Sequence, residues 1–291
     1  MTTKGIYNTL VTQLDKLARH NRQGSFRTKD RYYEAVKRFC AYLAAHYHLQ
    51  KLENISGKHL VRYVLYLQEQ GKSASTIKTD LSAIRFFHDK MSHPRYALPG
   101  NEELGVALEH RLFGQQDRTW TNPEFGKLIG RAMAEEREDY ILALYLARYA
   151  GLRIHECFRM DTAAAERALR ENALTVKGKG GKVRIVPIED DRITMMLQRL
   201  LDKTERGHKL LVPDGIPTDR VINGMQQFII RHRDTICDPT APDRYITFHG
   251  LRHTYAAEKY TSLVNGGMTP LDAHFTVSLS LIHISEPTRR S

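Results

Sequence analysis

The sequence predicts a mainly α-helical protein (α+β class) with two domains, a helical bundle followed by a mostly helical domain that carries a small β-hairpin. Three observations lead to this prediction. Apolar residues recur at helical spacing through residues 5–92, residues 92–118 have the composition of a linker, and a glycine- and lysine-rich turn separates two short alternating segments near residue 180. The length of 291 residues, with 41% apolar and 26% charged residues, is that of a globular protein with enough apolar material for a core.

The first domain is expected to be a bundle of four short helices. Asp30–Tyr47 places its apolar side chains on one helical face. Ser56 is a candidate N-cap for a helix that runs to Gln68 and stops at Gly71, and Ser73 stands at the start of the next helix. Four short helices joined by short turns favour a small bundle.

The second domain is expected to begin near Trp120, where Thr121 and the following Asn-Pro-Glu form a helix-start signal. The first long apolar helix, Tyr140–Tyr149, is broken at Gly151. The remaining expected elements are two strands of a hairpin, Ala173–Val176 and Val183–Pro187, and three helices, Asp190–Leu201, Thr218–Arg233 and His249–Val264.

The charge is strongly basic, with 44 Lys and Arg against 33 Asp and Glu and a formal net charge of +11. Residues 1–118 hold 19 of these basic residues and 11 of the acidic ones, so most of the surplus lies in the first domain. Basic side chains placed on phosphates release counterions, which favours a polyanionic partner. Nucleic acid is therefore the preferred partner, an anionic membrane is a weaker one, and a solvated basic surface is the alternative without function.

Cys40, Cys157 and Cys237 are odd in number and widely spaced, which fits neither a disulfide framework nor a CxxC metal site. The N-terminus lacks the basic-then-apolar pattern of a signal peptide, and no stretch approaches the roughly 18–20 apolar residues of a membrane span. We expect a cytoplasmic protein that does not enter a membrane.

Three separated segments carry residues suited to phosphate chemistry: Ala150–Glu156, the hairpin turn within Lys177–Pro187, and His249–Ala256. Taken singly, each has an ordinary interpretation as surface cations or a solvated turn. His249 and His253 lie four residues apart and could share a metal, but Arg252 between them would repel a cation. Together, two arginines, a lysine and a histidine supply fixed cations for phosphate oxygens and a proton donor for a leaving hydroxyl, without a metal.

The order Gly-Leu-Arg, then a Gly-Lys-Gly hairpin, then His-x-Leu-Arg-His resembles the tyrosine recombinases, or phage-type integrases. The resemblance implies that Arg153 and Arg252 clamp the phosphate of the DNA backbone. It implies that Lys179 is the general acid for the leaving 5′ oxygen and that His249 assists proton transfer at the nucleophile. Glu156 matches an acidic residue that orients the first arginine, and we expect His253 to give packing support.

The same resemblance assigns the two domains. Residues 1–112, with a linker to about 118, resemble a helical core-binding (SAM-like) DNA-binding domain, which in this family closes around DNA opposite the catalytic domain. Residues 119–277 resemble the catalytic domain. Basic residues of the helical domain and of the hairpin turn are the candidates for further DNA contacts: Lys78, Arg85, Lys177 and Lys182.

The pattern stops before the nucleophilic tyrosine that the family carries near its C-terminus. No tyrosine follows Tyr260, and both Tyr255 and Tyr260 lie too early, on the helix that carries His249 and Arg252. Residues 278–291 resemble the translation of a sequencing-library adapter, so we interpret them as a non-native tail; a degenerate or truncated gene is the alternative. His283 is the one histidine near the place of the family's second histidine, and it lacks the preceding Leu-Gly.

The expected function is site-specific DNA recombination, with strand cleavage and rejoining through a phosphotyrosyl intermediate at double-stranded attachment sites. The resemblance implies no cofactor and no metal, and a homotetramer on DNA for the intact enzyme. Without the tyrosine, the chain is expected to bind DNA and not to cut it. A non-catalytic DNA-binding regulator derived from a recombinase is the second hypothesis. A nucleotide-binding enzyme is disfavoured because Val183 follows Lys182 where a P-loop requires Ser or Thr.

Overall fold

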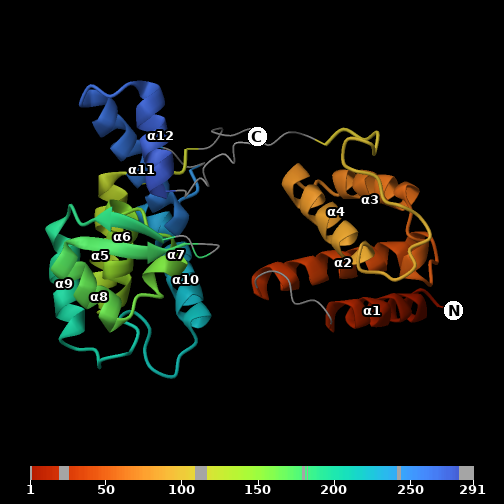
Figure 1. Cartoon of the computed structure of the whole chain (residues 1–291), viewed down its shortest axis with the longest axis horizontal. Coiled ribbons are helices and arrows are strands. Elements are labelled where there is room, and N and C mark those ends of the chain that lie inside the picture. The colour runs from red at the N-terminus through yellow and green to blue at the C-terminus, as the bar shows by residue number, and fades with distance from the viewer. Residues whose placement is uncertain are drawn as a thin grey trace, which may run out of the picture. The chain divides into compact units, whose positions relative to one another are not determined.

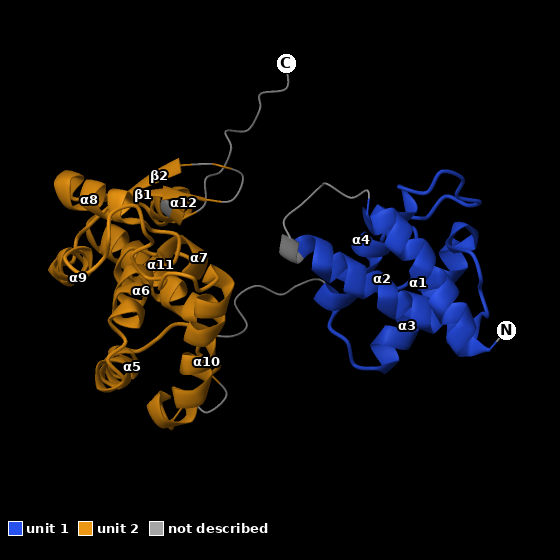
Figure 2. Ribbon diagram, turned by 90° about the horizontal axis from the view of Figure 1, so that it is seen from below, with its two compact units in different colours: residues 1–113 blue, residues 114–291 orange. Residues whose placement is uncertain are grey.

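The computed structural model describes residues 2–19, 26–108, 117–178, 181, 183–240 and 244–281. The chain divides into two compact units, residues 1–113 and residues 114–291 (Figure 2). Within the described residues the structure is mostly helical, and its one sheet has two strands. The predicted mainly α-helical class with a small hairpin is confirmed.

The described residues of the first unit form four α-helices and one short 3-10 helix (Figure 1): α1 Thr3–Arg19, α2 Phe26–His46, η1 Leu52–Asn54, α3 Gly57–Glu69 and α4 Ala74–His88. Ser56 is the N-cap of α3, as expected, and its backbone N donates to His59 Nδ1 at 3.0 Å, the reciprocal bond of a capping box. Helix α4 opens at Ser73, whose hydroxyl accepts a hydrogen bond from Thr76 N at 3.3 Å. Helix α2 begins at Phe26, earlier than the expected Asp30.

The core of the first unit lies between α2 and its neighbours α1 and α4. Leu10, Phe39, Leu43 and Leu81 are fully buried there. Buried residues recur at intervals of three or four along a helix, as Ile6, Leu10 and Leu14 do on α1, so each helix buries one stripe and leaves its charged face in water.

A buried carboxylate, Asp80, lies on the inner side of α4. Its Oδ1 accepts a hydrogen bond from Arg38 Nη2 at 2.8 Å, and its Oδ2 accepts one from the Tyr63 hydroxyl at 3.2 Å. A buried carboxylate is tolerated only when such partners satisfy it. Asp80 therefore ties α4 to α2 and α3 by polar contacts within the apolar core.

We expect Asp80→Ala to lower the free energy of unfolding of the first unit by about 2 kcal/mol, because the buried Tyr63 hydroxyl loses its acceptor. Urea unfolding followed by far-UV circular dichroism measures the loss. Fluorescence of Trp120, the one tryptophan of the chain, reports the second unit and should not change. Asp89→Ala is the control, because that side chain is 80% exposed, and it should stay within about 0.5 kcal/mol of the original chain. Equal losses for the two variants would contradict the prediction.

The second unit is built around helix α6 (Glu138–Tyr149), whose residues from Tyr140 to Arg148 are all buried. It packs against α5, α7, α9 and α11. The other elements of the unit are α5 Asn122–Ala134, α7 Ile154–Cys157, α8 Thr162–Glu171, β1 Ala173–Lys177, β2 Val183–Pro187, α9 Asp191–Leu201, α10 Thr218–Ile236, α11 Phe248–Asn265 and α12 Pro270–Leu281.

Helices α8 and α12 have no counterpart among the expected elements. Helix α8 buries only small residues, Thr162, Ala165 and Ala168; Asp161 caps its start and Asn172 ends it in the left-handed conformation (φ 48°). Helix α12 continues to Leu281, past residue 277 where the native sequence was expected to end; residues 282–291, with His283, lie outside the described residues.

The expected hairpin is present, with β1 and β2 antiparallel and Ala173 opposite Pro187. Leu174 and Val176 face inward from β1, and Arg184 and Val186 face inward from β2. A charged side chain therefore occupies an inner position of the sheet. No helix in the described part of the chain combines the length and the hydropathy needed to cross a membrane.

Candidate active site

The turn that follows α6 presents Arg153. Gly151 has a φ of +63°, a conformation that favours glycine, and the chain then enters the short helix α7 with Arg153 at its N-cap. A Cβ atom on Gly151 would lie only 2.6 Å from Cδ1 of the Tyr255 ring, which is too close for a side chain at this position. Helix α6 therefore ends before Gly151, as expected. The close contact between Gly151 and Tyr255 fixes the turn that carries Arg153.

Glu156 joins two arginines from different segments. Its side chain is 1% exposed, and its Oε1 accepts hydrogen bonds from Arg153 Nη1 at 2.9 Å and from Arg184 Nη1 at 3.0 Å. Its Oε2 accepts from the Arg153 backbone N at 2.8 Å and from Arg184 Nη2 at 2.7 Å. Burial alone would raise the pKa of this carboxyl, but the hydrogen bonds from Arg184 and Arg153 lower it to about 2. Glu156 is therefore ionised at neutral pH.

The start of α11 is fixed by Trp120, which is distant in sequence. The indole Nε1 of Trp120 donates to Thr247 O at 2.9 Å, and its backbone N donates to the Thr254 hydroxyl at 2.7 Å. A Cβ atom on Gly250 would lie 2.4 Å from Arg118 O and 2.9 Å from the Trp120 ring. This close packing explains the glycine within the His-Gly-Leu-Arg segment.

Arg252 is buried on α11 and reaches the same turn as Arg153. Its Nη1 donates to Gly151 O, and its Nη2 donates to Leu281 O at the end of α12. Burial, with the nearby positive charges of Arg153 and Arg184, lowers the pKa of Arg252 to about 10, so it still carries its charge at neutral pH. The structure thus brings Arg153, Glu156 and Arg252 together, as the sequence pattern implied.

His249 and His253 pack edge to face on α11, with their ring centroids 4.8 Å apart. Both side chains are exposed, yet the protein around them removes part of their water. This desolvation, and then the positive charges of His253, Arg252 and Arg153, lowers the pKa of His249. The His249 imidazole is therefore neutral at pH 7, a form that can accept a proton.

The lysines of the hairpin turn fall largely outside the described part of the chain. Lys179 and Lys182 are among these residues, so their placement stays a prediction. Lys177 is exposed at the end of β1, opposite Val183.

Of the two candidates on α4, Lys78 is half-buried, and Arg85 contacts its own unit. The Arg85 Nε donates to Pro99 O and its Nη1 to Asn101 Oδ1, both at 2.8 Å. These bonds give Arg85 a structural role, and a DNA contact for either side chain stays a prediction.

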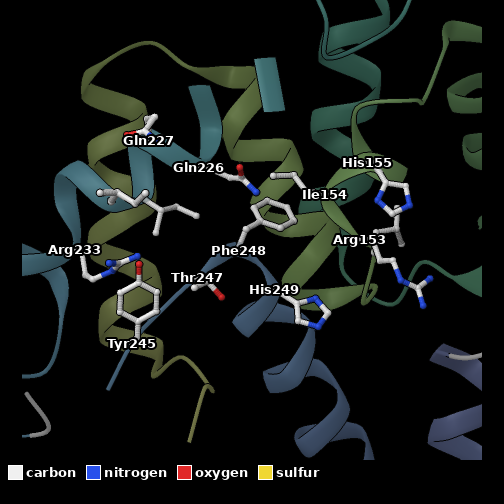
Figure 3. Close-up of a pocket in the computed structure, with 13 residues that line it drawn as sticks. Arg153, Ile154, His155, Gln226, Gln227, Arg233, Tyr245, Thr247, Phe248 and His249 are labelled. Carbon is white, nitrogen blue, oxygen red and sulfur yellow. The ribbon is translucent and has the colours of Figure 1, made fainter. Parts of the chain in front are cut away.

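A cavity of about 550 Å³ adjoins Arg153 and His249. Figure 3 shows these two side chains toward one end and Arg233 with Tyr245 toward the other. The Arg233 guanidinium lies 3.7 Å from the centre of the Tyr245 ring, a cation–π contact. The remaining wall comes from α10 and from the segments around Arg153 and His249: Leu152, Ile154, His155, Gln226, Gln227, Ile229, Ile230, Thr247 and Phe248.

Two site residues were missed by sequence reasoning. Arg184 lay within the predicted hairpin without a role, although the strand alternation places it on the same face as Val186. Trp120 was used only to mark a domain start, and nothing local indicates its contact with α11. In the described residues, no group of three His, Cys, Asp or Glu side chains could hold a metal ion.

Comparison with known proteins defines the class of this chain. Residues 12–92 match the phage integrase N-terminal SAM-like domain, and residues 126–270 match the phage integrase family. The chain belongs to the phage integrase family, that of the tyrosine recombinases. It is 27% identical over 202 residues to the tyrosine recombinase XerC of Chlamydia caviae. The aligned region covers 67% of this chain and 62% of the length of that relative.

Solved structures share the fold. A lambda integrase dimer bound to a COC′ core site aligns over 100% of this chain and 98% of its own, with a TM-score of 0.59 and 17% identity. The Tn1549 transposon integrase in complex with circular intermediate DNA aligns over 99% of this chain and 97% of its own, with a TM-score of 0.55 and 17% identity. The XerH recombinase bound to palindromic difH substrate aligns over 94% of this chain and 78% of its own, with a TM-score of 0.62 and 17% identity.

Proposed function

We propose that this chain is a site-specific DNA recombinase, or integrase, that binds double-stranded attachment sites. The observation that carries the proposal is the convergence of Arg153 and Arg252 on the turn after α6, with the neutral His249 beside them. Two guanidinium groups can hold the non-bridging oxygens of one phosphate as charge develops in the transition state. The net charge of +11 supports a nucleic acid partner.

In the reaction of an intact family member, a tyrosine oxygen attacks phosphorus, a 3′-phosphotyrosyl bond forms, and the 5′ oxygen leaves. In such a reaction, Arg153 and Arg252 would hold the phosphate, and His249 would accept the proton of the attacking tyrosine hydroxyl. Lys179 would protonate the 5′ oxygen as it departs. Glu156 orients Arg153 through the hydrogen bonds described above, and His253 supports His249 by ring packing. Each step transfers the phosphodiester to a new oxygen, so no cofactor takes part.

The printed sequence carries no tyrosine after Tyr260, and we propose that this polypeptide binds DNA without cleaving it. The ring of Tyr255 lies against Gly151, which supports a packing role for it. We further propose that residues 1–112 form the DNA-binding domain, that residues 119–277 form the catalytic domain, and that residues 278–291 are a non-native tail. We also propose that the protein is cytoplasmic and that four intact subunits assemble on DNA. A non-catalytic DNA-binding regulator derived from a recombinase is the second candidate.

The test is a nicked duplex that carries the junction DNA flanking the gene in its source. Two proteins are compared, the chain as printed and a version that continues in the source reading frame after codon 278. We expect both to shift the duplex, and only the second to form a covalent adduct on a denaturing gel. An adduct with the printed chain would mean that Tyr255 or Tyr260 is a nucleophile, which Tyr255→Phe and Tyr260→Phe would distinguish. No adduct with either protein, at undiminished binding, would favour the regulator.

A further inference from the structure

The first three residues of strand β2 reverse the usual alternation, although Val186 is buried as expected. Val183 and Ile185 point outward with exposed fractions of 53% and 70%, whereas Arg184 between them is 5% exposed. A two-stranded sheet that covers a core normally buries its apolar residues and exposes its charges. Burying a guanidinium costs free energy unless it is paired, so the partner of Arg184 explains its position.

That partner is Glu156, whose acceptor capacity is full. An ionised carboxylate offers about four lone-pair sites. Arg184 occupies two of them through its terminal nitrogens, and Arg153 occupies the other two through its backbone N and Nη1. Arg184 thus takes half of the available acceptors.

Because Arg184 takes two of the four acceptor sites of Glu156, Arg153 cannot use all of its side-chain donors on this carboxylate. Its side chain is 32% exposed, and among the described residues its Nε and Nη2 donate to no protein group. If Arg184 were absent, the buried carboxylate would have two open acceptor sites beside one remaining guanidinium. Arg153 could then turn both terminal nitrogens onto Glu156, in the bidentate geometry that arginine and carboxylate prefer.

We propose that Arg184 is a positioning residue that saturates Glu156, so that Arg153 keeps part of its guanidinium available to a DNA phosphate. This inference rests on the proposed function, because it requires Arg153 to contact DNA. It also implies that the Arg184–Glu156 pair affects DNA binding, whereas an ordinary buried ion pair affects only stability. Loss of Arg184 should change DNA binding through Arg153, and removal of the Glu156 charge should reverse that change.

The experiment measures binding of the full chain to a short fluorescein-labelled duplex of mixed sequence over a series of KCl concentrations. The slope of log K against log[KCl] counts the phosphates that the protein neutralises. We expect Arg153→Ala to reduce the slope by about 1. Arg184→Met should reduce it by the same amount, the two substitutions together should reduce it no further, and Glu156→Gln combined with Arg184→Met should restore it.

Arg148→Met is the matched control. Arg148 is also buried and also binds a carboxylate with both terminal nitrogens, Nη1 and Nη2 each 2.5 Å from an oxygen of Glu258, but Glu258 does not contact Arg153. Its loss should lower stability and leave the slope unchanged. If Arg184→Met does not fold, Arg184→Lys replaces it, because a single ammonium group cannot make a bidentate contact with both oxygens of Glu156. The slope should again fall, and Glu156→Gln should again restore it.

The outcomes distinguish the positioning role of Arg184 from the phosphate contact of Arg153. A slope reduced by Arg153→Ala but unchanged in both Arg184 variants would overturn the positioning role and leave the proposed function intact. A slope unchanged by Arg153→Ala would overturn the phosphate clamp itself, and the inference with it.

Discussion

Glu156→Ala will destabilise the second unit by about 3–5 kcal/mol, the range seen when one partner of a buried ion pair is removed. The substitution leaves Arg184, whose side chain is 4% exposed, without any of its carboxylate hydrogen bonds, and it also removes the acceptor of the Arg153 backbone N. Urea unfolding followed by Trp120 fluorescence measures the loss in this unit. The change in midpoint, at constant slope, gives the free energy.

Glu138→Ala is the matched control for this prediction. Glu138 also joins two cations, Arg199 and Lys203, but its side chain is 25% exposed and theirs are 62% and 55% exposed. Its loss should cost less than about 1 kcal/mol, because water replaces the ion pairs. Similar losses at the two positions would mean that the buried arrangement around Glu156 contributes no more than a surface one.

The pH dependence gives an independent check on the same residue. The pKa of Glu156 is about 2 in the folded chain, below its ordinary value of 4.5. A group with a lowered folded pKa stabilises the protein above its unfolded pKa and loses this contribution as the pH falls. The difference in stability between the original chain and Glu156→Gln should therefore be constant above about pH 5 and shrink between pH 4.5 and 2. A difference that stays constant down to pH 2 would contradict the ionised, paired state.

The helices of the first unit were predictable because their determinants are local. Apolar spacing places Phe39 and Leu43 on one face of α2, and Ser73 caps α4 as expected. Helix ends were less accurate, as the early start of α2 at Phe26 shows. Helix α8 escaped prediction because its buried face carries small residues such as Ala165 and Ala168 in place of large apolar ones, and its end depends on a left-handed Asn172.

The site residues were predictable only where they belong to a motif. Arg153, His249 and Arg252 stand in short segments whose spacing carries information, and the structure gathers them. Arg184 and Trp120 act through contacts with residues far away in the sequence, which no local pattern encodes. For Arg184, the one available signal was a charge on the face of β2 that also carries Val186, where a buried strand would place an apolar residue.

Gly151→Ala will destabilise the second unit by about 2–5 kcal/mol, from two causes that act together. A residue with a Cβ atom in the left-handed conformation costs about 1–2 kcal/mol. The new methyl group would also lie 2.6 Å from Tyr255 Cδ1, and such overpacking costs a further 1–3 kcal/mol, because the ring must move. Trp120 fluorescence in a urea titration measures the sum.

Gly215→Ala separates the two causes. Gly215 has a similar φ of +73°, and a Cβ atom there would meet nothing within 4 Å, so this variant should lose only the backbone contribution of about 1–2 kcal/mol. Equal losses at Gly151 and Gly215 would show that the Tyr255 contact is unimportant. Because Gly151 O also accepts a hydrogen bond from Arg252, displacement of this turn should weaken DNA binding in Gly151→Ala and not in Gly215→Ala. That joint effect on stability and binding is expected only if the turn after α6 holds both arginines.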